Sequence, residues 1–302
     1  MRLIHWTKHL SRCSATFAVK PCLQLQGGKR SEMKRLKLFL CAAALITFTV
    51  TSTTFAQTDL TPGTVNYSIE QNGKKLGSAS YTIESQPNKF LVTSTGKMSD
   101  GKFTYAFSNT QKVDRSLNLI TDQLSGVVNG KAVSFSASSD PTGRQFKLDI
   151  SADGTRQNNA VDRNQNAVLL TDLDPAAYLL LARVAMRTPS HSWALIPKEN
   201  GFLVPVTFTP QPDTQGHLNG QAIPVKYTSA AIGGQNAITI QLFYSPDGQL
   251  LEADLPQQNF YVIREGFKLT NRPKPPELPR EAAPPAPDQN QQSKLQDSYT
   301  GQ

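Results

Sequence analysis

Apolar and polar residues alternate in short runs along the middle of this chain, between residues 64 and 270. In the first run, Val65, Tyr67 and Ile69 are separated by polar neighbours, and the run ends at Asn72-Gly73. A period of two places alternate side chains on one face of a strand, and Asn-Gly tolerates the positive φ of a tight hairpin turn. The pattern therefore predicts a strand followed by a turn, and it recurs up to residue 270.

One stretch breaks this alternation and predicts a helix over residues 174–187, with the sequence DPAAYLLLARVAMR. Asp174 can accept hydrogen bonds from the first helical turn, and Pro175 suits the first helical position. Apolar residues surround the predicted helix except along Arg183 and Arg187, which lie four residues apart on one face. Because a helix that is apolar nearly all round is buried, we expect it on the concave side of the sheet.

Together these patterns predict a mainly β fold, in which a curved, half-barrel-like antiparallel sheet of about 10 to 13 strands packs on one buried helix. No other helical segment lies between the predicted strands, so parallel βαβ architecture is not expected. The final strand, residues 260–269, is apolar on both faces, and we expect it in a central position or under the helix.

The beginning of the chain has the pattern of a targeting segment. Residues 34–56 contain basic residues, then an apolar run, then small residues before Gln57, which is the order found in a cleavable signal peptide. The apolar run is shorter than the ~20 residues that a transmembrane helix needs. We therefore expect export to the periplasm or outside the cell, cleavage near Ala56 within a signal peptide of residues 33–56, and no stable transmembrane anchor.

The remaining terminal segments also lack a globular pattern. Residues 1–32 show no periodicity, and we interpret them as upstream sequence or as an extended leader before Met33. After residue 271 the chain is rich in proline and glutamine, and such a segment buries too little apolar surface to fold alone. We expect a disordered, partly extended tail over residues 271–302, which leaves residues 57–270 as a single β-rich domain.

Charge and cysteine content exclude several classes of function. The chain of 302 residues has a formal charge of +8, but residues 1–56 hold nine of the 31 Lys and Arg and one of the 23 Asp and Glu. The remainder is therefore neutral and lacks the basic surface that nucleic-acid binding requires. Cys13, Cys22 and Cys41 all precede the expected cleavage site, so the mature chain has no disulfide, thiolate metal site or cysteine nucleophile.

Three segments resemble a family of uncharacterised bacterial envelope proteins that is defined as a domain of unknown function. They are NYSIEQNGKKLGSASYTIE at residues 66–84, DPAAYLLLARV at residues 174–184 and LFYSPDGQLLEADLP at residues 242–256. The sheets of that family are similar to those of periplasmic lipoprotein carriers. The resemblance implies a curved antiparallel sheet wrapped around a helix, and it assigns no catalytic residue.

The candidate catalytic groups are few. His191 and His217 have no ligand at metal-binding spacing, so no metal site or cofactor is predicted. Asp172 and Asp174 flank Leu173, and Glu252 and Asp254 flank Ala253. A secreted hydrolase could use such a carboxyl pair, but we interpret Glu252 and Asp254 as a solvated strand face and Asp174 as a helix cap. There is no nucleophile elbow, P-loop or dinucleotide motif, and we predict no catalytic residue.

Tyr178, Arg183, Arg187 and Trp193 are the candidate ligand-binding residues. Two guanidinium groups at the mouth of an apolar sheet could bind an anionic headgroup or a carboxylate. Alternatively, the two arginines extend from a buried helix to pair with acidic residues of neighbouring strands, and this is the explanation we prefer from the sequence.

The sequence thus favours a non-catalytic exported protein that binds an apolar or amphiphilic ligand, such as a lipid, or an envelope protein. Two alternatives from other classes stay open. One is a secreted hydrolase that uses Glu252 and Asp254 or His191, and the other is a structural or assembly protein whose proline-rich tail reaches a partner.

Overall fold

The computed structural model describes residues 60–187, 191–197, 201–234 and 237–272, all of which belong to one compact unit. The predicted upstream segment, the signal peptide and residues 273–302 of the predicted tail lie outside the described residues.

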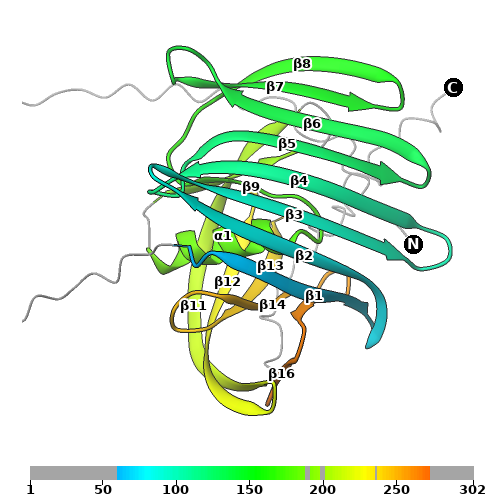
Figure 1. Ribbon diagram of the computed structural model, residues 1–302, viewed down its shortest axis with the longest axis vertical. Helices are drawn as coiled ribbons and strands as arrows, with labels where there is room; N and C mark the ends of the chain where they lie inside the picture. Colours follow the sequence, from blue (N-terminus) through cyan, green and yellow to red (C-terminus); the bar gives the residue numbers. More distant parts are fainter. Residues whose placement is uncertain (1–59, 188–190, 198–200, 235–236, 273–302) are drawn as a thin grey trace, which may run out of the picture. The chain divides into compact units, whose positions relative to one another are not determined.

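Strands make up most of the described chain (Figure 1). The first half contains β1 (Gly63–Gln71), β2 (Lys74–Gln86), β3 (Lys89–Ser99), β4 (Thr104–Asp114), β5 (Leu119–Val128), β6 (Lys131–Ser139), β7 (Gln145–Ala152) and β8 (Thr155–Asp162). The second half contains β9 (Ala167–Leu169), α1 (Pro175–Met186), β10 (Ser192–Ile196), β11 (Phe202–Leu218), β12 (Gln221–Ile232), β13 (Ile238–Tyr244), β14 (Leu250–Leu255), β15 (Phe260–Arg264) and β16 (Phe267–Leu269).

All of these strands belong to one sheet, in the order β8-β7-β6-β5-β4-β3-β2-β1-β15-β14-β13-β12-β11-β10-β9, and β16 pairs with β11. The two halves of the chain meet where β1 pairs with β15. Within the described residues the two ends of this order, β8 and β9, do not pair with each other, so the sheet is curved but open. The prediction of a mainly β, half-barrel-like sheet with one helix is confirmed.

Two details of that prediction are wrong. β9 and β10 pair in parallel, and because α1 lies between them in the sequence, β9-α1-β10 is a βαβ unit. β9 is three residues long, which is too short to show a period of two. The described chain also has sixteen strands rather than about 10 to 13. The additional strands include β8, which has no alternation of apolar and polar residues and is exposed at nearly every residue.

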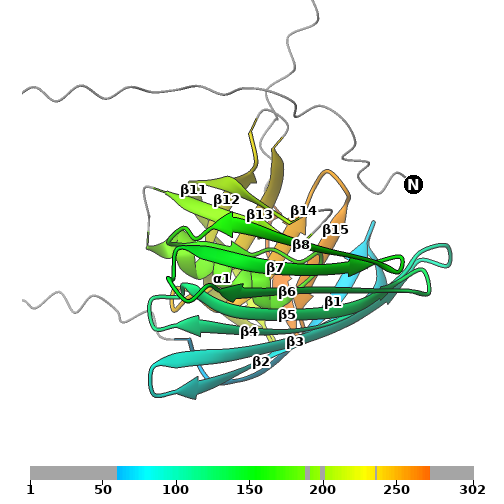
Figure 2. The ribbon, with the colours of Figure 1, turned by 90° about the horizontal axis from the view of Figure 1, so that it is seen from above.

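Helix α1 fills the inside of the curved sheet. It begins where the sequence predicts, since Oδ1 of Asp174 accepts a hydrogen bond of 2.9 Å from the backbone N–H of Ala176 and Pro175 follows the cap. All residues from Pro175 to Ala185 are buried. The helix contacts β2 and β3 on one side and β13 and β14 on the other, and Figures 1 and 2 show it enclosed between these strands. Among the described residues, no helix is long and apolar enough to cross a membrane.

We call the sheet face that contacts α1 the inner face and the opposite face the outer face. The main core lies between the inner face and α1. A second apolar cluster lies on the outer face and consists of Val225, Tyr227, Phe243, Leu251, Phe267 and Leu269. Because β16 supplies two of these side chains, the C-terminal part of the described chain covers the outer face.

The stretch 260–269 is two strands, not the single strand that was predicted. β15 ends at Arg264, the chain turns at Gly266, and β16 crosses to pair with β11. Gly266 has a φ of 80°, and an added Cβ would lie 2.0 Å from Oδ1 of Asn219. Glycine is therefore required where the chain turns back. We call residues 265–272 the C-terminal strap.

Candidate functional site

A pocket of about 190 Å³ lies beside α1, where the chain leads into β1. Its apolar wall includes Leu60, Val65, Ile83 and Leu179, which come from the start of the described chain, β1, β2 and α1. Its polar side is formed by Tyr81, Arg183, Gln249 and Arg264. We call it the Arg183 pocket. In this pocket an apolar surface meets the cationic side chains of Arg183 and Arg264.

Arg183 is buried without an anionic partner. Its residue is 4% exposed, and its Nε has no hydrogen-bond partner in the described part of the chain. No ion pair joins it to a carboxylate of a described residue, although the charge of Asp247 attracts it from a distance and partly opposes the lowering of its pKa by burial. Because an arginine side chain is not deprotonated in proteins, the structure holds a cation beside an apolar wall.

The other polar side chains of this pocket are uncharged or cationic. Nη1 of Arg264 donates to Oε1 of Gln249 over 2.8 Å. Burial raises the pKa of Tyr81, so its hydroxyl is neutral. Gly248, in the turn between β13 and β14, leaves room for the guanidinium, since a Cβ there would lie 2.8 Å from Nη1 of Arg183. The electrostatics of the pocket therefore suit an anion.

The four predicted ligand-binding residues are not brought together. Tyr178 is fully buried on another side of α1, and its hydroxyl accepts a hydrogen bond of 3.0 Å from the backbone N–H of Leu173. Burial raises the pKa of that hydroxyl. Trp193 lies in β10 between Ala167 of β9 and Pro205 of β11. Neither residue lines the Arg183 pocket.

Arg187 also points elsewhere. Its Nη1 lies 2.5 Å from the carbonyl oxygen of Ser116, in the turn between β4 and β5, to which it donates a hydrogen bond. The spacing of four residues places Arg183 and Arg187 on one helix face, but the curvature of the sheet gives them different surroundings. Of the predicted set, only Arg183 lines the pocket.

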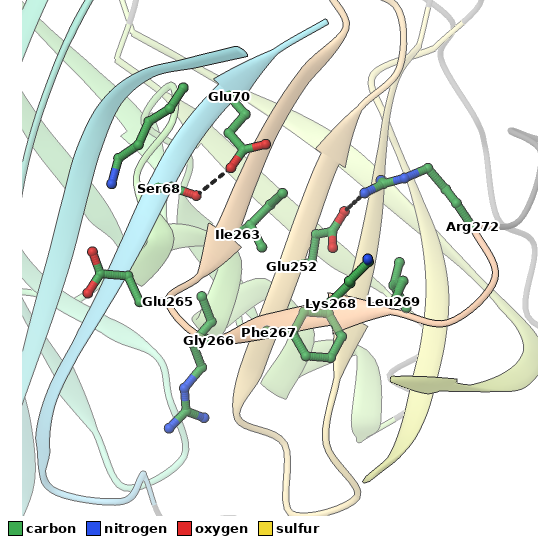
Figure 3. Close-up of a pocket in the computed structure, with 12 residues that line it drawn as sticks. Ser68, Glu70, Glu252, Ile263, Glu265, Gly266, Phe267, Lys268, Leu269 and Arg272 are labelled. Carbon is green, nitrogen blue, oxygen red and sulfur yellow. Dashed lines mark hydrogen bonds and ion pairs between the residues drawn. The ribbon is translucent and has the colours of Figure 1, made fainter. Parts of the chain in front are cut away.

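A larger pocket of about 550 Å³ lies under the C-terminal strap, on the outer face (Figure 3). Its lining includes Ser68 and Glu70 of β1, Glu252 of β14 and Ile263 of β15, together with Arg272 of the strap. Oγ of Ser68 donates to Oε1 of Glu70 over 3.0 Å. We call it the strap pocket. Sequence reasoning missed it because the strap was interpreted as part of one strand and the disordered tail.

The interpretation of Glu252 and Asp254 as a solvated face is wrong. Their residues are 1% and 2% exposed, because the strap and the neighbouring strands cover them. The guanidinium of Arg272 lies 2.5 Å from Oε1 of Glu252 and 2.5 Å from Oδ2 of Asp254, and it stacks over the ring of Tyr261. The sequence around Glu252 and Asp254 could not predict this burial, because the strap that covers the two side chains is a separate segment of the chain.

Burial raises the pKa of both carboxyl groups, and the neighbouring carboxylate raises that of Glu252 further, while Arg272 opposes these effects. The two groups therefore form an acid pair around one guanidinium. A glycosidase needs its two carboxyl groups on either side of the substrate bond. Here both lie on one strand and hold one arginine, an arrangement that favours cation binding over bond cleavage.

A buried polar cluster anchors the start of α1 to the sheet. Nδ2 of Asn109 donates to Oδ2 of Asp174 over 3.1 Å. Gln111 and Asp122 lie opposite each other on β4 and β5, next to this pair, and both are 1% exposed. Burial first, and then the charge of Asp174, raises the pKa of Asp122 well above its usual value. The cluster ties the helix to the sheet, and it lines neither pocket.

His191 and His217 lie apart from both pockets. His191 is exposed just before β10, and Nδ1 of His217 on β11 lies 3.5 Å from Oγ1 of Thr270. In the described ranges, no three His, Cys, Asp or Glu side chains lie close enough to hold a metal ion.

A search against protein-family models and a search among curated proteins each found no match. Among solved structures, the chain is similar to a β-barrel-like protein of the domain of unknown function DUF1849 from Brucella abortus, with 11% identity and a TM-score of 0.49 over 70% of this chain and 99% of that chain. It is also similar to a DUF1089 family protein from Pseudomonas aeruginosa, with 10% identity and a TM-score of 0.37 over 60% of this chain and 90% of that chain. At these values, neither similarity assigns a function.

Proposed function

We propose that this chain is a non-catalytic, exported binding protein that holds the anionic group of an amphiphile against Arg183. The observation that carries this proposal is the buried guanidinium of Arg183, which has no carboxylate partner among the described residues and faces an apolar wall. The residues of the pocket match an anionic headgroup with an apolar chain, which is the ligand class that the sequence suggested.

The energetics of burial support a ligand of this kind. Removing a charge from water costs several kcal/mol unless a partner compensates for it. A carboxylate or phosphate placed against Arg183 would form charge-assisted hydrogen bonds with its guanidinium. Arg264 and the hydroxyl of Tyr81 lie in the same pocket and can supply further donors.

The size of the pocket limits what it can enclose. A volume of about 190 Å³ is close to that of an engineered apolar cavity of about 150 Å³, which takes a benzene molecule. Sites that enclose a whole drug-sized ligand are larger, at about 300 to 1,000 Å³. The pocket therefore suits the headgroup and the first part of an apolar chain, and the rest of the ligand would extend past Leu60 and Val65.

The proposed location follows from the sequence. Residues 34–56 have the order of a cleavable signal peptide, and the resemblance to envelope proteins with carrier-like sheets agrees with export. An exported protein without catalytic motifs that meets lipids or other amphiphiles in the envelope would need a pocket of this chemistry.

Native mass spectrometry of the protein, purified without detergent from a bacterial envelope fraction, tests this function. We expect a co-purifying amphiphile that is retained by the wild type and by Arg187→Met, and lost from Arg183→Met. Arg187→Met is the matched control, since it removes a guanidinium from the same helix outside the pocket. The proposal is wrong if all three proteins have the bare mass, or if Arg183→Met retains the same ligand as the wild type.

A further inference from the structure

The strap pocket is a second cavity, on the face of the sheet opposite to α1. Figure 3 shows the strap crossing in front of β14 and β15, with Arg272 beyond its far end directed back toward Glu252. At about 550 Å³, its size falls within the usual range for small-molecule sites, about 300 to 1,000 Å³. Ile263, Phe267 and Leu269 give it apolar walls.

The acidic part of this pocket is fixed and buried. Glu252 lines the pocket, and Asp254, two residues further along β14, also binds Arg272; β14 is buried at every residue. On the same outer face, Gln241 of β13 pairs with Asp254 across the strands. A guanidinium that meets two carboxylates and the face of an aromatic ring forms charge-assisted and cation–π contacts together.

The buried side chains around the acid pair have polar atoms that Arg272 does not contact. Oδ1 of Asp254 and Nε2 of Gln241 have no hydrogen-bond partner within the described ranges, although both residues are at most 2% exposed. A buried polar group without a partner costs about 1 to 3 kcal/mol. Of the two, Oδ1 of Asp254 is an acceptor and can receive a further donor, whereas Nε2 of Gln241 is itself a donor.

Arg272, in contrast, is the exchangeable component. Its side chain is 41% exposed, and the strand that precedes it, β16, is three residues long. The acids belong to a buried strand inside the sheet, whereas the arginine follows the last strand, so replacing the arginine would require only a local movement of the strap.

We propose that the strap pocket binds a small ligand with a guanidinium or primary ammonium group on an apolar body, in exchange for Arg272. The cationic group takes the position of the Arg272 guanidinium between Glu252 and Asp254, and the apolar body packs on Ile263, Phe267 and Leu269. This pocket shares only Arg264 with the lining of the Arg183 pocket, and the ligands proposed for the two pockets have opposite charges, so the two proposals can fail independently.

Calorimetric titration of the purified full chain with benzoyl-arginine amide tests this inference. The corresponding citrulline compound is the matched probe, because it has nearly the same shape without the charge. We expect saturable binding of the arginine compound and at least about tenfold weaker binding of the citrulline compound, since hydrogen bonds to charged groups contribute about 1.5 to 3 kcal/mol. Equal affinity for the two compounds would overturn the inference, and so would no binding of either one.

Variants of the strap pocket test whether Arg272 competes with the ligand and whether Glu252 and Asp254 bind it. Arg272→Gln should strengthen binding of the arginine compound about tenfold or more, because it removes the resident guanidinium. Adding Glu252→Gln and Asp254→Asn to that variant should abolish the gain, and Arg156→Gln, which changes an arginine on β8 that pairs with Asp149, should have no effect. If Arg272→Gln keeps its circular dichroism spectrum but binds no more tightly than the wild type, Arg272 is only a structural clamp.

Discussion

At the scale of one residue, the proposed binding role of Arg183 has a consequence for stability. The guanidinium is 4% exposed and its Nε has no hydrogen-bond partner in the described chain. Replacing a buried charge with an apolar side chain of similar size is often neutral or stabilising. Binding and stability should therefore respond to substitution at this position in opposite directions.

We expect Arg183→Met to raise the free energy of unfolding of the ligand-free protein by about 1 kcal/mol or more. Urea unfolding, followed by circular dichroism, measures this difference. Arg187→Met should instead lower stability, because it removes the hydrogen bond to the carbonyl of Ser116 without relieving a fully buried charge. A clear loss of stability in Arg183→Met would mean that Arg183 is a structural residue.

Asp122 links stability to pH. Burial and the charge of Asp174 raise its pKa in the folded protein, whereas the unfolded chain ionises near 3.8. Between these two values the folded state keeps a proton that the unfolded chain has lost. The stabilisation is therefore fully present below the unfolded pKa and is lost as the pH rises through the folded pKa.

Asp122→Asn should raise the free energy of unfolding at neutral pH by about 1 kcal/mol or more, because it removes the ionisable group from a buried site. It should also flatten the decline in stability above the unfolded pKa. Urea unfolding at a series of pH values measures both effects, with Asp162→Asn on the exposed strand β8 as the control. A decline of the same size in Asp122→Asn and the wild type would rule out this role for Asp122.

At the scale of elements, α1 depends on its first turn. Asp174 caps the helix at the backbone N–H of Ala176 and accepts a hydrogen bond from Asn109 of β4. Asp174→Ala should lower the free energy of unfolding by about 1 to 2 kcal/mol, because it removes the cap. Asp174→Asn, which keeps a capping oxygen, should lose less. Thermal unfolding of the two variants measures the difference, and equal losses would show that the cap does not stabilise the helix.

The elements that the sequence predicts are those with a local signal. The Asp174-Pro175 start of α1 and the hairpin turn at Asn72-Gly73 follow from the conformational preferences of single residues. β8 and β9 could not be predicted in this way, since one is exposed on both faces and the other has three residues. Their place in the sheet depends on pairing with β7 and β10, which is a tertiary effect.

The candidate sites follow the same division. The sequence singled out Arg183, because a cation on an apolar helix is visible from helical periodicity alone. It could not separate Arg183 from Arg187, since their different surroundings are set by strands distant in the sequence. It misjudged Glu252 and Asp254, because their burial depends on the strap that turns back at Gly266.

At the scale of the whole molecule, the open sheet should be unevenly stable. β8 lies at one end of the strand order and is exposed at nearly every residue, whereas β14 lies inside the order and is buried at every residue. Amide groups open more easily where few apolar contacts cover them. We expect hydrogen exchange, followed by mass spectrometry, to be fastest for β8 among the strands and slow for β14. Equal protection would show that the sheet opens only as one unit.

The central claim, that the Arg183 pocket binds the anionic group of an amphiphile, is tested most directly by calorimetric titration with sodium octanoate. We expect saturable binding to the wild type, affinity at least about tenfold weaker for Arg183→Met, and the same octylamine titration for the wild type and Arg183→Met. Octanoate binding of equal affinity in the wild type and Arg183→Met, or no binding to the wild type, would contradict the claim.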